Sequence, residues 1–111
     1  MAIRLDLEPF YATQDVAVSV AFLITEIVEF AMLCGAASVS LSLTGEGRKG
    51  TATLTMESES LRADVPCSQE LSDRFERIVT GLSRQLRNTI ERDREGGRYS
   101  LDIAVVEKAE S

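Results

Sequence analysis

The longest apolar stretch of the chain, residues 17–36, has the spacing of one long helix. Apolar side chains fill most of its positions, so we expect a helix buried in the core rather than one lying on the surface. Its few polar residues are therefore the informative ones. At about 100° per residue, Ser19, Glu26 and Glu29 fall on one stripe of this helix. The same stripe carries Phe22, Phe30 and Leu33, with Thr25 at its edge.

Alternating apolar and polar residues predict short strands on either side of this helix. Residues 2–8 alternate in this way and end at Pro9. Residues 38–43 and 51–56 alternate again and flank a turn that contains Gly45, Gly47 and Gly50, so they predict an antiparallel hairpin. The candidates for its buried face are Leu41, Leu43, Leu54 and Met56.

A second helix is predicted over about residues 69–87, with Ser68 as its N-cap and Asn88 in the left-handed position that ends it. Residues 57–67 before it lose all periodicity and predict an extended loop. A last hairpin is predicted from residues 89–92 and 98–106, joined by a turn around Gly96 and Gly97. The apolar stripe of the second helix consists of Leu71, Phe75, Ile78, Val79, Leu82 and Leu86. Its opposite face carries Arg74, Arg77, Arg84 and Arg87 with Asp73 and Glu76.

The predicted order of elements is strand, helix, hairpin, helix, hairpin. Five short strands and two long helices bury their apolar faces by stacking as two layers. We therefore expect an α+β fold, a two-layer sandwich in which two long helices cover one face of a mixed, mostly antiparallel sheet. The chain of 111 residues should form one domain over residues 1–106, followed by a flexible tail at 107–111.

The charge balance and the missing residue types exclude several classes of function. A net charge of −6 argues against nucleic acid or an anionic membrane as the partner. Two glutamates in the apolar helix would be costly at the centre of a bilayer, so we expect no membrane contact. The chain has no histidine, which excludes a histidine general base, a histidine zinc ligand and a phosphorylated histidine within it.

The two cysteines, Cys34 and Cys67, lack the spacing of metal ligands, and no metal site is predicted. We expect reduced thiols in a cytoplasmic protein, with Cys34 acting as a small buried apolar residue.

The residues at two places resemble the histidine-kinase-like ATPase family (GHKL, or Bergerat fold). LITEIVEFAMLCGA, residues 23–36, resembles the N-box helix of this family. Residues 77–107, RIVTGLSRQLRNTIERDREGGRYSLDIAVVE, resemble its final helix and hairpin, especially those of the HWE-type and related bacterial sensor histidine kinases. Together with the order of the elements, the resemblance covers nearly the whole chain.

The resemblance assigns Glu26 to the glutamate that polarises the attacking group in phosphoryl transfer. It places Phe30 where the family has the asparagine that holds Mg²⁺, and a phenyl ring offers a hard cation no oxygen. Ser58 and Ser60 fall at the aspartate and glycine of the adenine motif, unless a bulge lets Glu57 or Glu59 take over. Asp73 and Phe75 fall at the two glycines of a phosphate-binding motif at the start of the second helix.

These departures predict a degenerate domain: a bacterial two-component signalling module that no longer binds Mg-ATP and acts in protein docking or phosphorelay. The implied partners are a response regulator or a histidine-bearing kinase or phosphotransfer domain, and a homodimer is possible. Arg74, Arg77 and Arg84 are the candidate partner face. Two alternatives stay open: a working histidine kinase domain that uses ATP and magnesium with Glu26 as its catalytic residue, and an interaction protein of the anti-sigma-factor kind. Glu26, Glu29 and the arginines also have a simpler interpretation as solvated edges of their helices.

Overall fold

The structure, a computed structural model, describes residues 1–45, 49–64 and 67–106. The predicted tail at 107–111 and Gly47 of the predicted turn lie outside the described residues. The chain forms strand β1 (Ala2–Leu7), helix α1 (Gln14–Leu33), strands β2 (Ser38–Thr44) and β3 (Thr51–Ser58), a 3₁₀ turn η1 (Glu59–Leu61), helix α2 (Gln69–Gln85), and strands β4 (Glu91–Asp93) and β5 (Arg98–Ala104).

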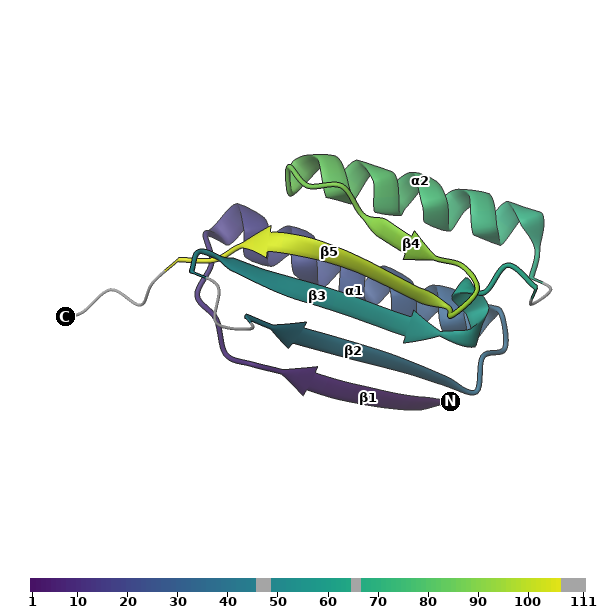
Figure 1. The fold of residues 1–111 in the computed structure, drawn as a ribbon. Helices are drawn as coiled ribbons and strands as arrows, with labels where there is room; N and C mark the ends of the chain where they lie inside the picture. Colours follow the sequence, from purple (N-terminus) through teal and green to yellow (C-terminus); the bar gives the residue numbers. More distant parts are fainter. Residues whose placement is uncertain (46–48, 65–66, 107–111) are drawn as a thin grey trace.

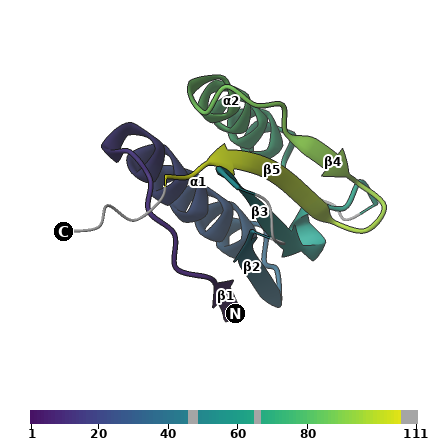
Figure 2. The ribbon, with the colours of Figure 1, turned by 60° about the vertical axis from the view of Figure 1, so that its left-hand side comes forward.

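The five strands form one sheet in the order β1-β2-β3-β5-β4. β1 runs parallel to β2, and the other neighbouring strands are antiparallel. The two helices lie side by side on one face of the sheet (Figures 1 and 2). The fold is therefore the predicted α+β two-layer sandwich.

Alternation within the strands sets the core. β2 and β3 pair Leu41 with Met56 and Leu43 with Leu54, which places all four side chains on the face that the helices cover. Leu41, Leu54 and Met56 are buried, while Leu43 is only partly buried. The predicted inner face of this hairpin is thus confirmed.

Helix α1 is buried on one side only. Leu23 and Ile27 are fully buried against the sheet, but Val18, Phe22 and Met32 are 59%, 54% and 59% exposed. The prediction of a wholly buried helix was wrong for this outer side, because no further layer covers α1 in the described structure. By length and composition alone, α1 is apolar enough to cross a bilayer. Helices that pack in a protein core meet the same criterion, and α1 packs against the sheet.

The polar stripe predicted on α1 borders α2. The Ser19 hydroxyl donates a hydrogen bond to Gln85 Oε1 at 3.2 Å, and Arg74 of α2 donates to Glu29 Oε1 at 3.4 Å. Polar residues in this apolar helix therefore serve the contact between the two helices. Phe22 and Leu33, from the same stripe, point to the solvent.

The ends of α2 follow the predicted capping chemistry only in part. Ser68 caps the helix, its Oγ accepting from the Leu71 N–H at 3.4 Å. At the other end the left-handed residue is Arg87, with φ 59°, and not Asn88 as predicted. The side-chain amide of Asn88 instead donates to the Asp102 carbonyl at 2.7 Å, which ties the loop after α2 to β5.

The remaining predicted boundaries move by a few residues. β3 continues through Ser58, so the expected loop at 57–67 begins with strand and 3₁₀ turn. The last hairpin is shorter than predicted, since its strands span Glu91–Asp93 and Arg98–Ala104. In its turn, Gly97 has φ +69°, and a Cβ there would lie 2.5 Å from the Ser58 carbonyl oxygen. Glycine is required at this position by both its conformation and its contact.

The prediction of free thiols was wrong, because Cys34 and Cys67 form a disulfide with a Cα–Cα distance of 5.5 Å. Cys34 follows the last turn of α1, and Cys67 lies just before α2. The two cysteines are 33 residues apart in sequence, and only the packing of α1 against α2 brings them together. Sequence spacing alone carries no sign of this contact.

Candidate functional site

Three of the predicted nucleotide-site residues meet at one end of the sandwich. Phe30, Ser60 and Phe75 line a cavity of about 270 Å³. Its walls come from the last turns of α1, η1 with the residues that follow it, the first half of α2 and the start of β5. The structure thus brings together positions that the sequence assigned to one site.

Phe30 and Phe75 stack face to face in this cavity. Their ring centroids are 4.4 Å apart and their planes differ by 8°. Both side chains are buried, and Phe75 also contacts the ring of Tyr99 at a centroid distance of 6.3 Å. An aromatic surface therefore stands where the resemblance places a magnesium ligand and a phosphate-binding glycine.

Ser58 and Ser60 are buried, and their hydroxyl groups form a hydrogen bond with each other. Ser58 Oγ donates to the Ser38 carbonyl at 3.0 Å, so the 2.9 Å contact between the two hydroxyls is a donation from Ser60 to Ser58. Only lone pairs of the Ser60 oxygen stay available to the cavity. No charged acceptor stands at the predicted adenine position.

The alternative in which Glu57 or Glu59 replaces Ser58 does not fit the sheet. The ladder between β2 and β3 runs from Val39–Ser58 to Thr44–Thr53 without a bulge, so Ser58 stays on the inner face. Glu57 is exposed and accepts a hydrogen bond from Arg98 Nε at 2.9 Å. Glu59 is also exposed and accepts from the backbone N–H of Ala37.

Asp73 and Phe75 lie inside α2 rather than at its start, where the resemblance placed them. The helical hydrogen bonds begin with the Ser72 N–H, which donates to the Ser68 carbonyl at 3.0 Å. Backbone amides from Ser72 onward are thus committed to the helix and cannot cradle a phosphate. Asp73 is exposed, and its Oδ1 accepts from Gln69 Nε2 at 2.7 Å.

Glu26 lies on the far side of the stacked rings. It is half-buried in a shallow depression of about 10 Å³ on the seam between the helices, next to Leu71 and Arg74. Phe30 and Phe75 line both this depression and the larger cavity, so the rings separate Glu26 from Ser60. The predicted catalytic carboxylate does not face the cavity.

Sequence reasoning missed the polar wall of the cavity, which Arg62, Glu76, Arg94 and Tyr99 form. Tyr99 Oη donates to Glu76 Oε1 at 2.5 Å and accepts from Arg94 Nη1 at 3.2 Å. Glu76 also pairs with Arg92 at 2.9 Å. The sequence placed Glu76 with the outer arginines of α2, whereas it faces β4 and β5. Alternation with Leu101 and Ile103 was the available signal that Tyr99 points inward.

The environment of Tyr99 keeps its hydroxyl protonated. Burial is the largest cause and, with the hydrogen bond and charge of Glu76, it raises the pKa of Tyr99 to about 12. The nearby guanidinium groups of Arg94 and Arg92 act in the opposite direction and are outweighed. Tyr99 is therefore a structural donor to Glu76 at neutral pH, and its phenolate plays no part in the chemistry of the cavity.

Two of the residues between η1 and α2 that line the cavity have fixed partners. The Cys34–Cys67 disulfide holds Cys67, just before α2. Arg62, just after η1, makes two hydrogen bonds to Asp64, at 3.1 and 2.7 Å.

Across residues 1–45, 49–64 and 67–106, no three Asp, Glu, Cys or His side chains are grouped so that they could hold a metal ion.

Comparison with known proteins identifies the class of fold. No protein-family model matches the chain, and no curated protein does. Solved structures do match, and they show that the chain has a histidine-kinase-like fold.

Two of the matched structures come from Erythrobacter litoralis, and both belong to its EL346 blue-light activated histidine kinase. The match to this kinase has a TM-score of 0.69 and 17% identity, and covers 92% of the present chain. The match to its histidine kinase domain has a TM-score of 0.64 and 18% identity, and covers 94%. The present chain spans 37% of the first structure and 53% of the second.

Proposed function

We propose that the chain is a two-component signalling module, a histidine-kinase-like ATPase domain that does not bind Mg-ATP productively and acts by docking to a partner protein. The fold supports the class of module. The stacked pair of Phe30 and Phe75 is the observation that carries the loss of nucleotide binding, since it fills two positions that the family uses for magnesium and phosphate.

Magnesium requires several oxygen ligands in near-octahedral geometry. Phe30 supplies none, and Glu26 and Glu29 open onto the helix seam on the other side of the rings. The carboxylate of Glu76, which does line the cavity, is already bound to Tyr99 and Arg92. A triphosphate would enter this cavity without the cation that normally neutralises it.

The cavity also offers little to a nucleoside. Its volume of about 270 Å³ lies below the range of about 300–1,000 Å³ that is usual for small-molecule sites. The amine of an adenine base would find serine oxygens in place of a carboxylate, and a neutral acceptor gives the weaker hydrogen bond. Both the base and the phosphates therefore lack the groups that would hold them.

Calorimetric titration of the purified chain with ADP, and with ATP plus Mg²⁺, tests the proposal. We expect no binding at millimolar nucleotide, under conditions in which a nucleotide-competent histidine kinase domain gives a clear isotherm. Micromolar binding would show instead a working ATP-binding domain. Loss of histidine phosphorylation in a Glu26→Gln variant would then be the next measurement.

A further inference from the structure

Strand β1 is an uncovered edge of the sheet (Figure 1). Ile3, Leu5 and Leu7 are 51%, 58% and 46% exposed, although they pair in register with Val39, Leu41 and Leu43 and so share their face of the sheet. The helices cover β2 and β3 but leave these three side chains open. An edge strand with exposed apolar residues and one unpaired side is a ready template for pairing with another chain.

The backbone of β1 determines which groups are available for such pairing. The N–H of Ala2 donates to the Ala37 carbonyl at 2.9 Å, and the N–H of Glu8 donates to the Leu43 carbonyl at 3.0 Å. In a parallel pair, alternate residues direct both backbone groups toward the neighbouring strand. The even-numbered residues of β1 therefore face β2, and the N–H and C=O groups of Ile3, Leu5 and Leu7 point away from the sheet.

We propose that two copies of this chain pair antiparallel through β1, about a twofold axis at Leu5. In this register Leu5 lies opposite Leu5, Ile3 opposite Leu7, and Arg4 opposite Asp6. Each of Ile3, Leu5 and Leu7 both donates and accepts one backbone hydrogen bond across the axis. The two five-stranded sheets become one continuous sheet.

The charges select this register over its neighbours. A slip that brings the axis to Arg4 would set two arginines opposite each other, and a slip to Asp6 would oppose two aspartates. A shift by a single residue would set outward groups of one strand against inward groups of the other and reverse the faces. Only pairing about Leu5 matches both the hydrogen bonds and the charges, with Pro9 just beyond the paired residues.

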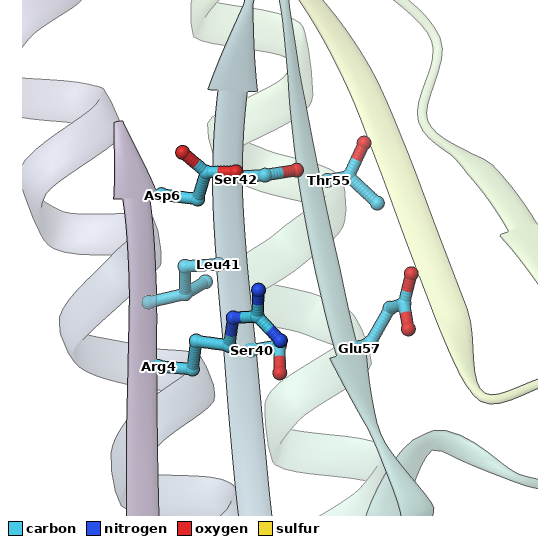
Figure 3. A pocket seen from close by; sticks show the side chains of 7 residues that line it. All are labelled: Arg4, Asp6, Ser40, Leu41, Ser42, Thr55 and Glu57. Atoms are coloured by element: carbon cyan, nitrogen blue, oxygen red, sulfur yellow. The ribbon is translucent and has the colours of Figure 1, made fainter. Parts of the chain in front are cut away.

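Arg4 and Asp6 are free to make these contacts. Figure 3 shows both side chains on the open face of the sheet, where they line a hollow of about 200 Å³ with Ser40, Ser42, Thr55 and Glu57. Within the described part of the chain neither side chain has an ion-pair partner. In the dimer, Arg4 and Asp6 form non-hydrogen-bonded pairs, whose Cα atoms approach to about 4.5 Å.

The apolar side of the dimer follows from the same register. Ile3, Leu5 and Leu7 of both copies lie on the helix side of the sheet, since the pleat places them opposite Arg4 and Asp6. They would form one apolar strip along the twofold axis, between the two α1 helices. Pairing thus buries side chains that the single chain leaves about half exposed.

Variants that reverse the charge at position 4 or position 6 test the proposal. Sedimentation over a range of protein concentrations gives the molar mass, and therefore the fraction of dimer. We expect a dimer for the natural chain. Arg4→Asp places carboxylates opposite each other and Asp6→Arg places guanidinium groups opposite each other, so each variant alone should dissociate at least about tenfold more readily. An equimolar mixture of the two variants restores both opposite-charge pairs, and it should form a heterodimer.

Circular dichroism and thermal unfolding must match those of the natural chain, which shows that the variants fold. A natural chain that stays monomeric would overturn the proposal, as would a dimer that neither variant weakens. The second outcome would move the contact to another surface, such as the exposed outer side of α1. The proposal does not depend on whether the cavity binds nucleotide.

Discussion

The proposed loss of nucleotide binding rests on single residues at the cavity. Phe30 could be compared with the family pattern in the sequence, and so could Phe75. Their face-to-face contact could not, because nothing in the chain indicates that residues 45 positions apart share one plane. The two rings form one packed unit. Phe30→Asn would therefore still leave Phe75 in the cavity.

Tyr99 makes the stability of the protein depend on pH in the alkaline range. Its pKa rises from 10.0 to about 12 on folding, so the folded state keeps a proton that the unfolded state loses above pH 10. This contribution is complete below pH 10 and falls as the pH rises toward 12, by roughly 2–3 kcal/mol in total. Urea unfolding of the natural chain should show this loss, and Tyr99→Phe should lack it.

The exposed Tyr11 and all other titrating groups are present in both proteins, so the difference between the two curves isolates Tyr99. Parallel curves between pH 9 and 12 would contradict the raised pKa of Tyr99. Tyr99→Phe should also be less stable at pH 7, because Glu76 loses a donor in a mostly buried position.

At the scale of the elements, periodicity and turn chemistry predict the fold well. Both helices and all five strands follow from the sequence, because each apolar pattern matches the face that its element buries. The sequence pattern gave wrong predictions where the conformation or burial of a residue depends on contacts with residues far away in the sequence. Asn88 was predicted to end α2, but its amide binds the Asp102 carbonyl, and Arg87 adopts the left-handed conformation instead. Likewise, the exposed side of α1 reflects how far the sheet and α2 extend, which composition does not show.

The disulfide between α1 and the start of α2 should contribute strongly to stability. It closes a loop over a sequence separation of 33, and the chain-entropy relation gives about 3–4 kcal/mol for a loop of this length. Cys34→Ser combined with Cys67→Ser should lower the free energy of unfolding by that amount, as measured by urea titration. Adding dithiothreitol should bring the natural chain to the same value and leave the double variant unchanged. Equal stability of the oxidised and reduced natural chain would contradict this assignment.

At the scale of the whole molecule, the surface proposed for the dimer and the candidate docking surface lie on different elements. The proposed dimer uses β1 at one edge of the sheet, while Arg77 and Arg84 are exposed on α2, which packs near the other end of the strand order. Among the described residues neither arginine has an ion-pair partner, whereas Arg74 is paired with Glu29. A net charge of −6 makes this basic patch a local exception, and it suits an acidic partner surface. A dimer through β1 would present two such patches.

If α2 is the docking face, reversing one of these charges should weaken the binding of a receiver domain or of a histidine-bearing phosphotransfer domain. Biolayer interferometry against such domains from the same organism should give a Kd about tenfold higher for Arg77→Glu, because a rim charge then repels the acidic partner. Lys49→Glu changes the net charge equally but lies on the loop between β2 and β3, so it controls for long-range attraction and should have a smaller effect. Equal losses for the two variants would point to net charge alone. No binding to any of these domains would contradict the docking function itself, and the proposed dimer would then need another role.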